Sequence, residues 1–363
     1  MALQTIQRDL VTPEEEVKFQ KFISPPKDNP DTPDRLKPDI EFYRKLMVGV
    51  DLNLPSRLPD GTDKVKMMVI ADDAPKNRLP EQFPSPLIRV RQGQIVHVHA
   101  DGGQDGHTIH FHGIEPTPMN DGVGKDSFEI GSYTYQWQPK HSGTYFYHCH
   151  KNTTLHVELG MYGPLIVDPP EGPGYVTGYN LPGHLIRYDV EAFWAADEID
   201  TRWHDLQHNA FLTHSGHDPN DPSTFTSDGI LNDFRPNVFV ISGAVRANDT
   251  TPITDSRVAV KAKVGQTILM RVVNAGYTIQ QFSFGLDADV IAMDGRPLGV
   301  PPTGKYSAPF RLSAGTPFRL TSAQRWELIM RPTRTGTFPA SVDYFDWVTG
   351  KKLATARSQI TVA

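Results

Sequence analysis

Histidines are concentrated in one short part of this chain. Seven of the 14 histidines lie between positions 107 and 156, together with the single cysteine. The segments HTIHFHG and YHCHKNTTLHVELGM supply His107, His110, His112, His148, Cys149, His150, His156 and Met161. Imidazole and thiolate groups together suit copper or zinc, and one cysteine with two histidines and a methionine is the ligand set of an electron-transfer copper centre. We therefore expect this segment to bind metal.

Strand alternation sorts these ligands into two sets. Side chains along a strand point to opposite faces in turn, so His110 and His112 share a face while His107 points away. By the same rule, the two histidines that flank Cys149 face away from it. If the two strands pair with matching faces, the inner set is His107, Cys149, His156 and Met161, and the outer set is His110, His112, His148 and His150. One short motif is therefore expected to build two metal sites back to back.

The remaining histidines have simpler interpretations. His97 and His99, in IVHVHA, share a strand face but have no second cluster beside them, and are predicted to be plain strand residues. His141, in the turn PKHSG, is expected to be exposed to solvent. The insertion WHDLQHNAFLTHSGHDPNDPST is interpreted as a solvated loop, with metal binding as the alternative for its histidines, which are His204, His208, His214 and His217.

Length and composition restrict the class of protein. The chain has 363 residues, enough for about two domains. Its net charge of −6 gives no electrostatic reason to expect nucleic-acid or anionic-membrane partners. The single cysteine excludes an intramolecular disulfide. The N-terminal residues lack the apolar region of a signal peptide and no run could span a bilayer, so we expect a soluble chain, cytoplasmic as given or exported if a leader has been removed.

Short β-branched and aromatic runs separated by turn residues predict an all-β protein; the chain contains 31 prolines and 29 glycines. Residues 1–63 are expected to form an extended N-terminal arm with one helix from about Asp39 to Met47. Residues 64–172 are predicted to be a first β-sandwich that positions the metal ligands. A linker rich in proline and glycine follows, and residues 185–363 are predicted to be a second β domain without an evident copper motif.

The first domain resembles the multicopper oxidases, the family of laccase and ascorbate oxidase. The resemblance rests on HTIHFHGI, NDG, SGTYFYHCH and GMYGPLIVDPPEG, and extends more weakly to VGQTILMRVVNAGY and VIAMDG in the second domain. It implies two tandem cupredoxin-like (plastocyanin-like) Greek-key β-sandwich domains. It also implies a type 2 copper at His110 and an acidic residue, Asp121, associated with proton delivery. The type 3 copper pair would be held by His112, His148 and His150.

Two departures from the family pattern change what the resemblance implies. The family's first domain ordinarily has no cysteine between its last two histidines, whereas here the type 1 ligands lie in the first domain, as in some two-domain members and in copper nitrite reductases. The second domain, at QQFSFGLDAD, lacks the His-x-His pair that would complete the cluster. A mononuclear or dinuclear copper site is therefore expected, completed across an oligomer interface or by the histidine-rich loop.

The sequence thus predicts a copper-dependent oxidoreductase with oxygen as the acceptor. A small-molecule or metal-ion reductant would give single electrons to the type 1 copper, and the four-histidine site would pass them to oxygen. One alternative is a nitrite-reductase-like enzyme, with copper held by His112, His148 and a neighbour's histidine. The other is a cupredoxin that only carries electrons or binds copper, although a carrier would not need four extra histidines. The four histidines of the outer set form only half of the family's cluster. We therefore also expect a homo-oligomer with this site at or near a subunit interface.

Overall fold

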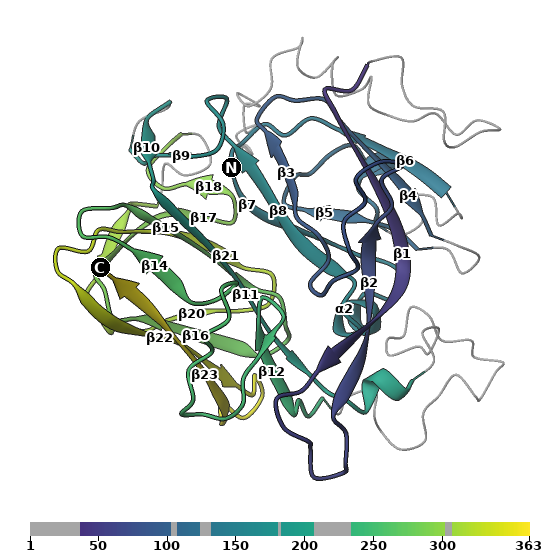
Figure 1. Ribbon diagram of the computed structural model, residues 1–363. Coiled ribbons are helices and arrows are strands. Elements are labelled where there is room, and N and C mark those ends of the chain that lie inside the picture. Colours follow the sequence, from purple (N-terminus) through teal and green to yellow (C-terminus); the bar gives the residue numbers. More distant parts are fainter. Residues whose placement is uncertain (1–36, 103–106, 124–131, 181–182, 207–233, 302–306) are drawn as a thin grey trace, which may run out of the picture.

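β-Branched and aromatic runs form nearly all the regular structure of the chain (Figure 1). The structure is a computed structural model that describes residues 37–102, 107–123, 132–180, 183–206, 234–301 and 307–363. These residues build two β-sandwiches joined by a short two-stranded sheet of β9 (Tyr175–Thr177) and β10 (Leu185–Arg187). Among the described residues, no helix is both long enough and apolar enough to cross a membrane.

The first sandwich consists of two four-stranded sheets. One has the order β2-β1-β4-β6, with the bounds β1 (Ile40–Asn53), β2 (Lys64–Asp72), β4 (Val96–Asp101) and β6 (Ser132–Trp137). The other has the order β3-β8-β7-β5, with the bounds β3 (Ile88–Arg91), β5 (His110–His112), β7 (Gly143–His148) and β8 (Tyr162–Asp168). Val98 and Tyr135 from the first sheet pack with Tyr147 and Leu165 from the second in one buried core.

The helix expected from about Asp39 to Met47 is wrong, because this stretch is the start of strand β1. Ile40 and Phe42 pack against the core, and Glu41 between them faces away, which is the alternation of a strand. β1 pairs in parallel with β4 and antiparallel with β2. The strand register shifts after Lys45, and Met47 has a φ of 59°. This irregularity interrupts the alternation of buried and exposed residues, so the sequence pattern does not indicate a strand.

The second sandwich is larger and has its own core. Its first sheet follows the order β13-β12-β11-β15-β21-β17-β18, with β19 also on β17; the bounds are β11 (Val190–Ile199), β12 (Val238–Ile241), β13 (Ala244–Val245), β15 (Ile268–Asn274), β17 (Ala288–Met293), β18 (Arg296–Pro297), β19 (Phe310–Leu312) and β21 (Arg325–Met330). Its second sheet follows β14-β23-β22-β16-β20, with the bounds β14 (Val260–Ala262), β16 (Ile279–Phe284), β20 (Phe318–Leu320), β22 (Gly336–Phe345) and β23 (Lys352–Val362). Trp194, Phe282 and Val342 lie in the core between them.

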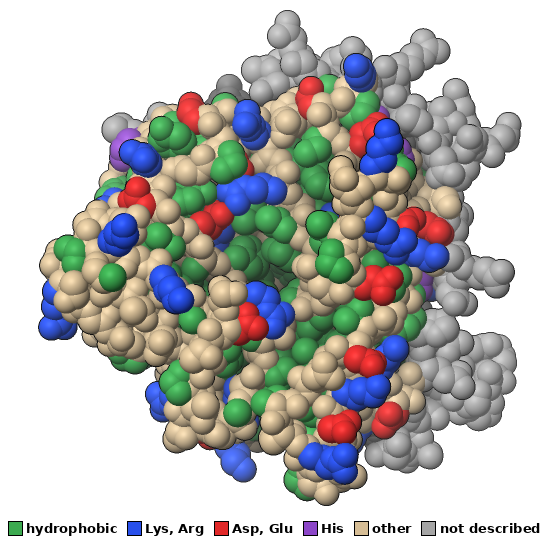
Figure 2. Space-filling model, viewed as in Figure 1, with side chains coloured by type: hydrophobic (Ala, Val, Ile, Leu, Met, Phe, Trp, Pro, Cys, Tyr) green, Lys and Arg blue, Asp and Glu red, His purple; other side chains and the backbone are tan. Residues whose placement is uncertain are grey.

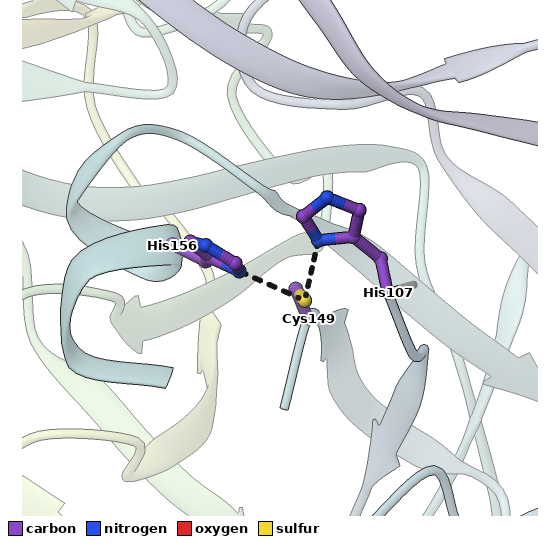
Figure 3. Close-up of side chains that lie close together, drawn as sticks. All are labelled: His107, Cys149 and His156. Carbon is purple, nitrogen blue, oxygen red and sulfur yellow. Dashed lines mark hydrogen bonds between the residues drawn. The ribbon is translucent and has the colours of Figure 1, made fainter. Parts of the chain in front are cut away.

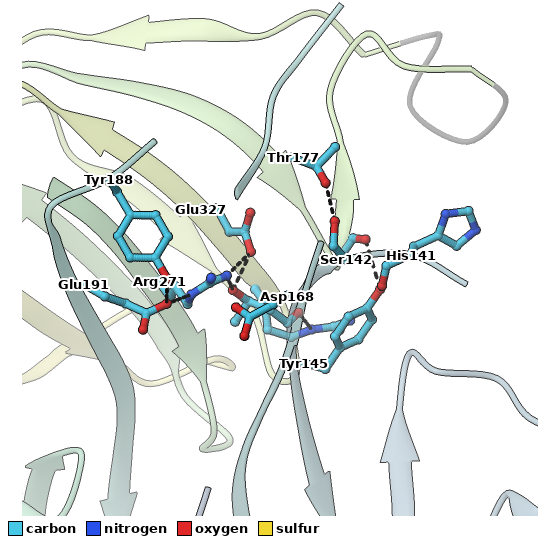
Figure 4. Close-up of polar contacts among 12 residues, drawn as sticks. His141, Ser142, Tyr145, Asp168, Thr177, Tyr188, Glu191, Arg271 and Glu327 are labelled. Atoms are coloured by element: carbon cyan, nitrogen blue, oxygen red, sulfur yellow. Dashed lines mark hydrogen bonds and ion pairs between the residues drawn. The ribbon is translucent and has the colours of Figure 1, made fainter. Parts of the chain in front are cut away.

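The two sandwiches are held together by apolar contacts and by a buried ionic network. Phe146 and Tyr162 of the first domain share a cluster with residues of the second, such as Val240. Arg271 donates hydrogen bonds to Thr144 Oγ1 at 2.9 Å and to Glu327 Oε1 at 2.5 Å, and links β7 to the second domain (Figure 4). Removal of one partner from a buried ion pair of this kind destabilises the fold, since a charge left alone in the interior is costly.

A hollow opens between the two domains on the face seen in Figure 2. It has a volume of about 620 Å³ and is lined by Leu87 and Ile166 of the first domain and by Phe193 and Val258 of the second. Arg89 lies at this hollow and donates hydrogen bonds to carboxylates of both domains, so the ionic network reaches its wall.

Candidate metal centres

The first candidate centre surrounds Cys149, directly after β7. Its Sγ atom lies 3.4 Å from Nδ1 of His156 and 3.6 Å from Nδ1 of His107, and both imidazole rings are turned toward the sulfur (Figure 3). The cysteine and both histidines are buried. Ligand atoms of the three residues all lie within 4.8 Å of one another. A thiolate and two imidazoles converging away from solvent fit a soft transition metal such as copper.

A short loop closes this centre from the other side. Helix α2 (Thr153–Glu158) presents His156, and the backbone N–H of Met161 donates to the carbonyl of His156 at 3.0 Å. The N–H of Cys149 then donates to the carbonyl of Met161 at 3.0 Å, which fixes the two residues as neighbours. Met161 is fully buried in the same core cluster as Cys149. The structure therefore brings together the four residues of the inner set.

The second candidate centre lies on the opposite face of the same strand pair. β5 and β7 are antiparallel, and His110 is directly opposite His148 in their register. Nδ1 of His112 lies 3.3 Å from Nε2 of His148, and the ring of His150 is 5.3 Å from that of His110. Ligand atoms of His110, His112 and His148 all lie within 4.8 Å of one another. The two sets thus face opposite ways, as strand alternation predicts.

Backbone carbonyls fix which nitrogen of two histidines is available to a metal. Nδ1 of His110 is 2.7 Å from the carbonyl oxygen of Asp121, and Nδ1 of His148 is 2.9 Å from that of Cys149. A carbonyl only accepts hydrogen bonds, so both Nδ1 atoms carry the proton and both Nε2 atoms present a lone pair. This arrangement orients a metal-binding imidazole from its far side.

Burial lowers the pKa of three imidazoles of the second centre and so favours their neutral form. The pKa of His112 is lowered to about 3, first by burial and then by the nearby Arg325 guanidinium. Burial likewise lowers the pKa of His148 to well below its usual value, and lowers that of His150. A neutral imidazole is the form that binds a metal ion, so these three side chains are prepared as ligands near neutral pH.

The second centre opens into a cavity at the border of the two domains. The cavity has a volume of about 500 Å³ and is lined by His110, His112 and Asp121 of the first domain and by Arg296 and Arg325 of the second. Sequence reasoning did not find either arginine, because each lies more than 180 positions away from the histidine motif it faces. The carboxylate of Asp121 is 3.3 Å from Nδ1 of His110.

Two glycines in the motifs allow this close packing. Gly113 has a φ of +88°, and a Cβ there would lie 2.5 Å from Nη2 of Arg325. Gly122 has a φ of +72°, and a Cβ there would lie 2.0 Å from the carbonyl oxygen of Ile109. Only glycine fits both the conformation and the space at these positions. The glycine of HFHG therefore leaves room for Arg325, and the glycine of NDG lets its turn lie against the backbone of Ile109 beside His110.

The simpler interpretations of the other histidines need two corrections. His141 is half-buried instead of exposed, and its pKa is lowered to about 4 by burial and by Arg296. His204, in the short helix η3 (Trp203–Asp205), has a buried side chain instead of a solvated one. Its Nδ1 donates a hydrogen bond to the carbonyl of Lys66 at 2.8 Å. The other three histidines of the proposed loop, His208, His214 and His217, lie outside the described residues.

Comparison with known proteins agrees with this geometry. Residues 61–172 match the family model described as multicopper oxidase. These residues are similar to a multicopper oxidase domain. Over 116 residues the chain is 40% identical to L-ascorbate oxidase from Cucumis sativus. This aligned part covers 30% of this chain and 19% of that protein. Over 94 residues it is 38% identical to copper resistance protein A from Pseudomonas syringae pv. tomato, covering 24% and 15% respectively. The matched part spans less than a fifth of each relative.

Solved structures match the fold over nearly the whole chain. The blue copper oxidase from Nitrosomonas europaea has a TM-score of 0.59 at 22% identity, covering 89% of this chain and 85% of that one. The copper nitrite reductase from the same organism has a TM-score of 0.55 at 18% identity, covering 89% and 94%. The predicted all-β architecture of two cupredoxin-like sandwiches is therefore confirmed, and so is the resemblance to multicopper oxidases. Members of that family bind copper, so copper is the metal that the domain implies.

Proposed function

We propose that the chain is a copper-dependent oxidoreductase that oxidises a small-molecule or metal-ion reductant one electron at a time and reduces oxygen. The observation that carries this proposal is the order His148-Cys149-His150 at the end of β7. The thiol faces the buried set of His107 and His156, whereas the flanking imidazoles face the second centre. Three consecutive residues thus join the two candidate centres covalently.

The donor atoms of each centre support copper in both. His107, Cys149 and His156 would hold a type 1 copper, with the buried Met161 as a weaker fourth ligand. We assign the outer site to His110, His112, His148 and His150. Copper held in the two places would supply one-electron redox chemistry, and the thiolate and imidazole sets would keep the reductant and oxygen at separate sites.

The surrounding residues hold the ligands and handle protons. The carbonyl groups of Asp121 and Cys149 keep the Nε2 lone pairs of His110 and His148 directed at the outer site. Reduction of oxygen to water consumes one proton for each electron, so the outer site needs a proton source. The Asp121 carboxylate borders the 500 Å³ cavity and lies beside His110, where it can take protons from solvent and release them at the reacting face.

The proposal is tested by copper content together with the choice of acceptor. We expect at least two copper ions per chain, a blue or green thiolate band, and oxygen uptake with a one-electron donor such as a substituted phenol. One copper per chain with a coloured but oxygen-inert protein would instead mean an electron carrier. Consumption of nitrite without oxygen uptake would mean a nitrite-reductase-like enzyme. Either of these results would contradict the oxidase.

The outer site also supports a proposal about assembly. By the resemblance to multicopper oxidases, its four histidines would supply half of the ligands of a trinuclear cluster. Its cavity is open at the domain border. We propose a homo-oligomer in which a second copy covers this site, as closed symmetric assemblies commonly cover such surfaces. Light scattering at working concentration should give a multiple of the chain mass of 40.5 kDa. A fully active monomer would contradict the proposal.

A further inference from the structure

A third group of metal-binding side chains lies on the other sheet of the first sandwich. Strand β4 reads VHVHAD, and Val96, Val98 and Ala100 point into the core. His97 and His99 therefore share the outer face, two residues apart on one strand. The parallel pairing of β1 with β4 places Glu41 directly beside His97. This cluster of Glu41, His97 and His99 uses none of the residues of the two centres described above.

The three side chains converge on a common point. Their ligand atoms all lie within 4.8 Å of one another, the same limit that the two other candidate centres meet. Nε2 of His99 is 4.0 Å from Oε1 of Glu41. That separation is too long for a hydrogen bond, but it leaves room for an ion between the two atoms, since metal bonds to imidazole nitrogen and carboxylate oxygen measure about 2.0–2.2 Å.

Two neighbouring side chains orient the cluster from behind. Nδ1 of His99 is 3.0 Å from Oγ1 of Thr134, which directs Nε2 toward Glu41. The hydroxyl of Tyr43 donates to Oε2 of Glu41 at 3.0 Å, which leaves Oε1 toward the histidine. The ring of Tyr43 also stacks on His99, with centroids 4.5 Å apart and planes 18° apart. Support of this kind is typical of residues that bind a metal.

The burial of the cluster is graded from inside to outside. His97 is 1% exposed, whereas the Glu41 side chain is 42% exposed. An ion can therefore reach the cluster from solvent at the carboxylate and be held against the sheet by the two imidazoles. Thr134 and Gln136, on the neighbouring strand β6, are also buried on this face, so the surroundings are polar and enclosed.

We propose that Glu41, His97 and His99 form a third metal site, which takes a divalent transition ion of the zinc class. Two imidazoles and one carboxylate are a ligand set that zinc uses in proteins. Calcium and magnesium prefer oxygen ligands, so the two imidazole nitrogens disfavour these ions. The ion would fasten β1 to β4 and so stabilise the first sheet. This inference is independent of the proposed oxidase function, because it concerns residues of the opposite sheet.

Zinc binding to the copper-free chain tests the proposal. The wild type, His99→Gln, Glu41→Gln and the control His184→Gln are dialysed against Zn²⁺, and zinc per chain is measured by elemental mass spectrometry. His184 is an exposed histidine outside all three clusters. We expect His99→Gln to hold about one zinc fewer than the wild type, and Glu41→Gln to bind that zinc at least about tenfold more weakly. The control should keep the full complement.

Thermal melting of the same proteins gives a second readout. An ion that binds the folded chain raises its melting temperature, so added Zn²⁺ should raise that of the wild type by more than that of His99→Gln or Glu41→Gln. Equal zinc content in all four proteins would overturn the proposal, and so would an equal loss of zinc in the control. If His99→Gln does not fold, Glu41→Gln decides the question, because its carboxylate is partly exposed and the substitution keeps its shape.

Discussion

The two faces of the β5–β7 strand pair differ in how they are completed. The thiolate face is closed by one stretch of chain, since the loop and helix between Cys149 and Met161 fold back over the sulfur. The imidazole face is closed only in part, and its remaining wall comes from the second domain through Arg296 and Arg325. The contrast shows that the buried centre is built within one domain, whereas the open centre also depends on residues of the second domain.

This difference also separates the functions expected of the two faces. A centre sealed in a core of aromatic and aliphatic side chains changes little in shape, as an electron-transfer ligand set requires. A centre facing a cavity of about 500 Å³ can admit a small acceptor molecule and protons. Substitutions on one face should therefore leave the signature of the other face intact, and the predictions below depend on that separation.

The largest effect is expected from Cys149→Ser. Serine removes the thiolate that produces the visible charge-transfer band, and it has nearly the same size in a fully buried position. We expect complete loss of the band and of turnover, while the outer site still binds copper. Absorption and EPR spectra of the copper-loaded variant check this. Persistence of the same visible band would show that the thiolate assignment is wrong.

Replacement of a ligand on the other face should give the converse pattern. His110→Ala removes an imidazole from the outer site without touching the buried set, so turnover should be lost and the visible band should stay at its wild-type position and intensity. His184→Ala, at an exposed position, is the matched control for general effects of losing a histidine. Loss of the band in His110→Ala with activity retained would contradict the separation of the two faces.

The buried ionic network beside β7 is tested by Arg271→Met. Arg271 is 1% exposed and pairs with Glu327, so methionine leaves a buried carboxylate without its cation. We expect a loss of about 3–5 kcal/mol in the free energy of unfolding, measured by denaturant titration. The double variant Arg271→Met/Glu327→Gln should recover part of that loss, because it also removes the stranded charge. Equal stability of the wild type and the single variant would show that the buried pair of Arg271 and Glu327 does not stabilise the fold.

The sequence was sufficient for the parts of this molecule that depend on local pattern. Alternation along HTIHFHG and YHCH separated the two ligand sets because side chains of a strand have a period of two, whatever the rest of the fold. The helix expected from about Asp39 to Met47 is wrong because the bulge near Met47 breaks that same period. Local pattern is therefore reliable only where the backbone keeps its regular geometry.

Contacts between distant segments could not be predicted in this way. Arg325 reaches the imidazole face because β21 packs against β7, and no residue near position 325 carries a signal of that contact. The same holds for Glu41, which meets His97 through a parallel strand pair separated by more than 50 positions. His141 and His204 looked solvated because the sequence around them is polar, yet packing against other segments covers both of them.

The smallest expected effect concerns proton supply to the imidazole face. Asp121→Asn keeps the backbone carbonyl that orients His110 and a side chain of the same shape, but it removes the group that can take up and release a proton. Because general acid catalysis typically contributes about 10²–10⁴-fold, we expect turnover to fall about 100-fold. The thiolate band should be unchanged, since Asp121 does not contact the buried set.

A purely structural role would lower copper content at the outer site as well, so copper per chain is measured on the same sample. Full copper content with a wild-type rate across the pH range would exclude Asp121 as the proton donor. The source would then have to lie elsewhere on the wall of the cavity, where Glu115 is the other first-domain carboxylate among the described residues.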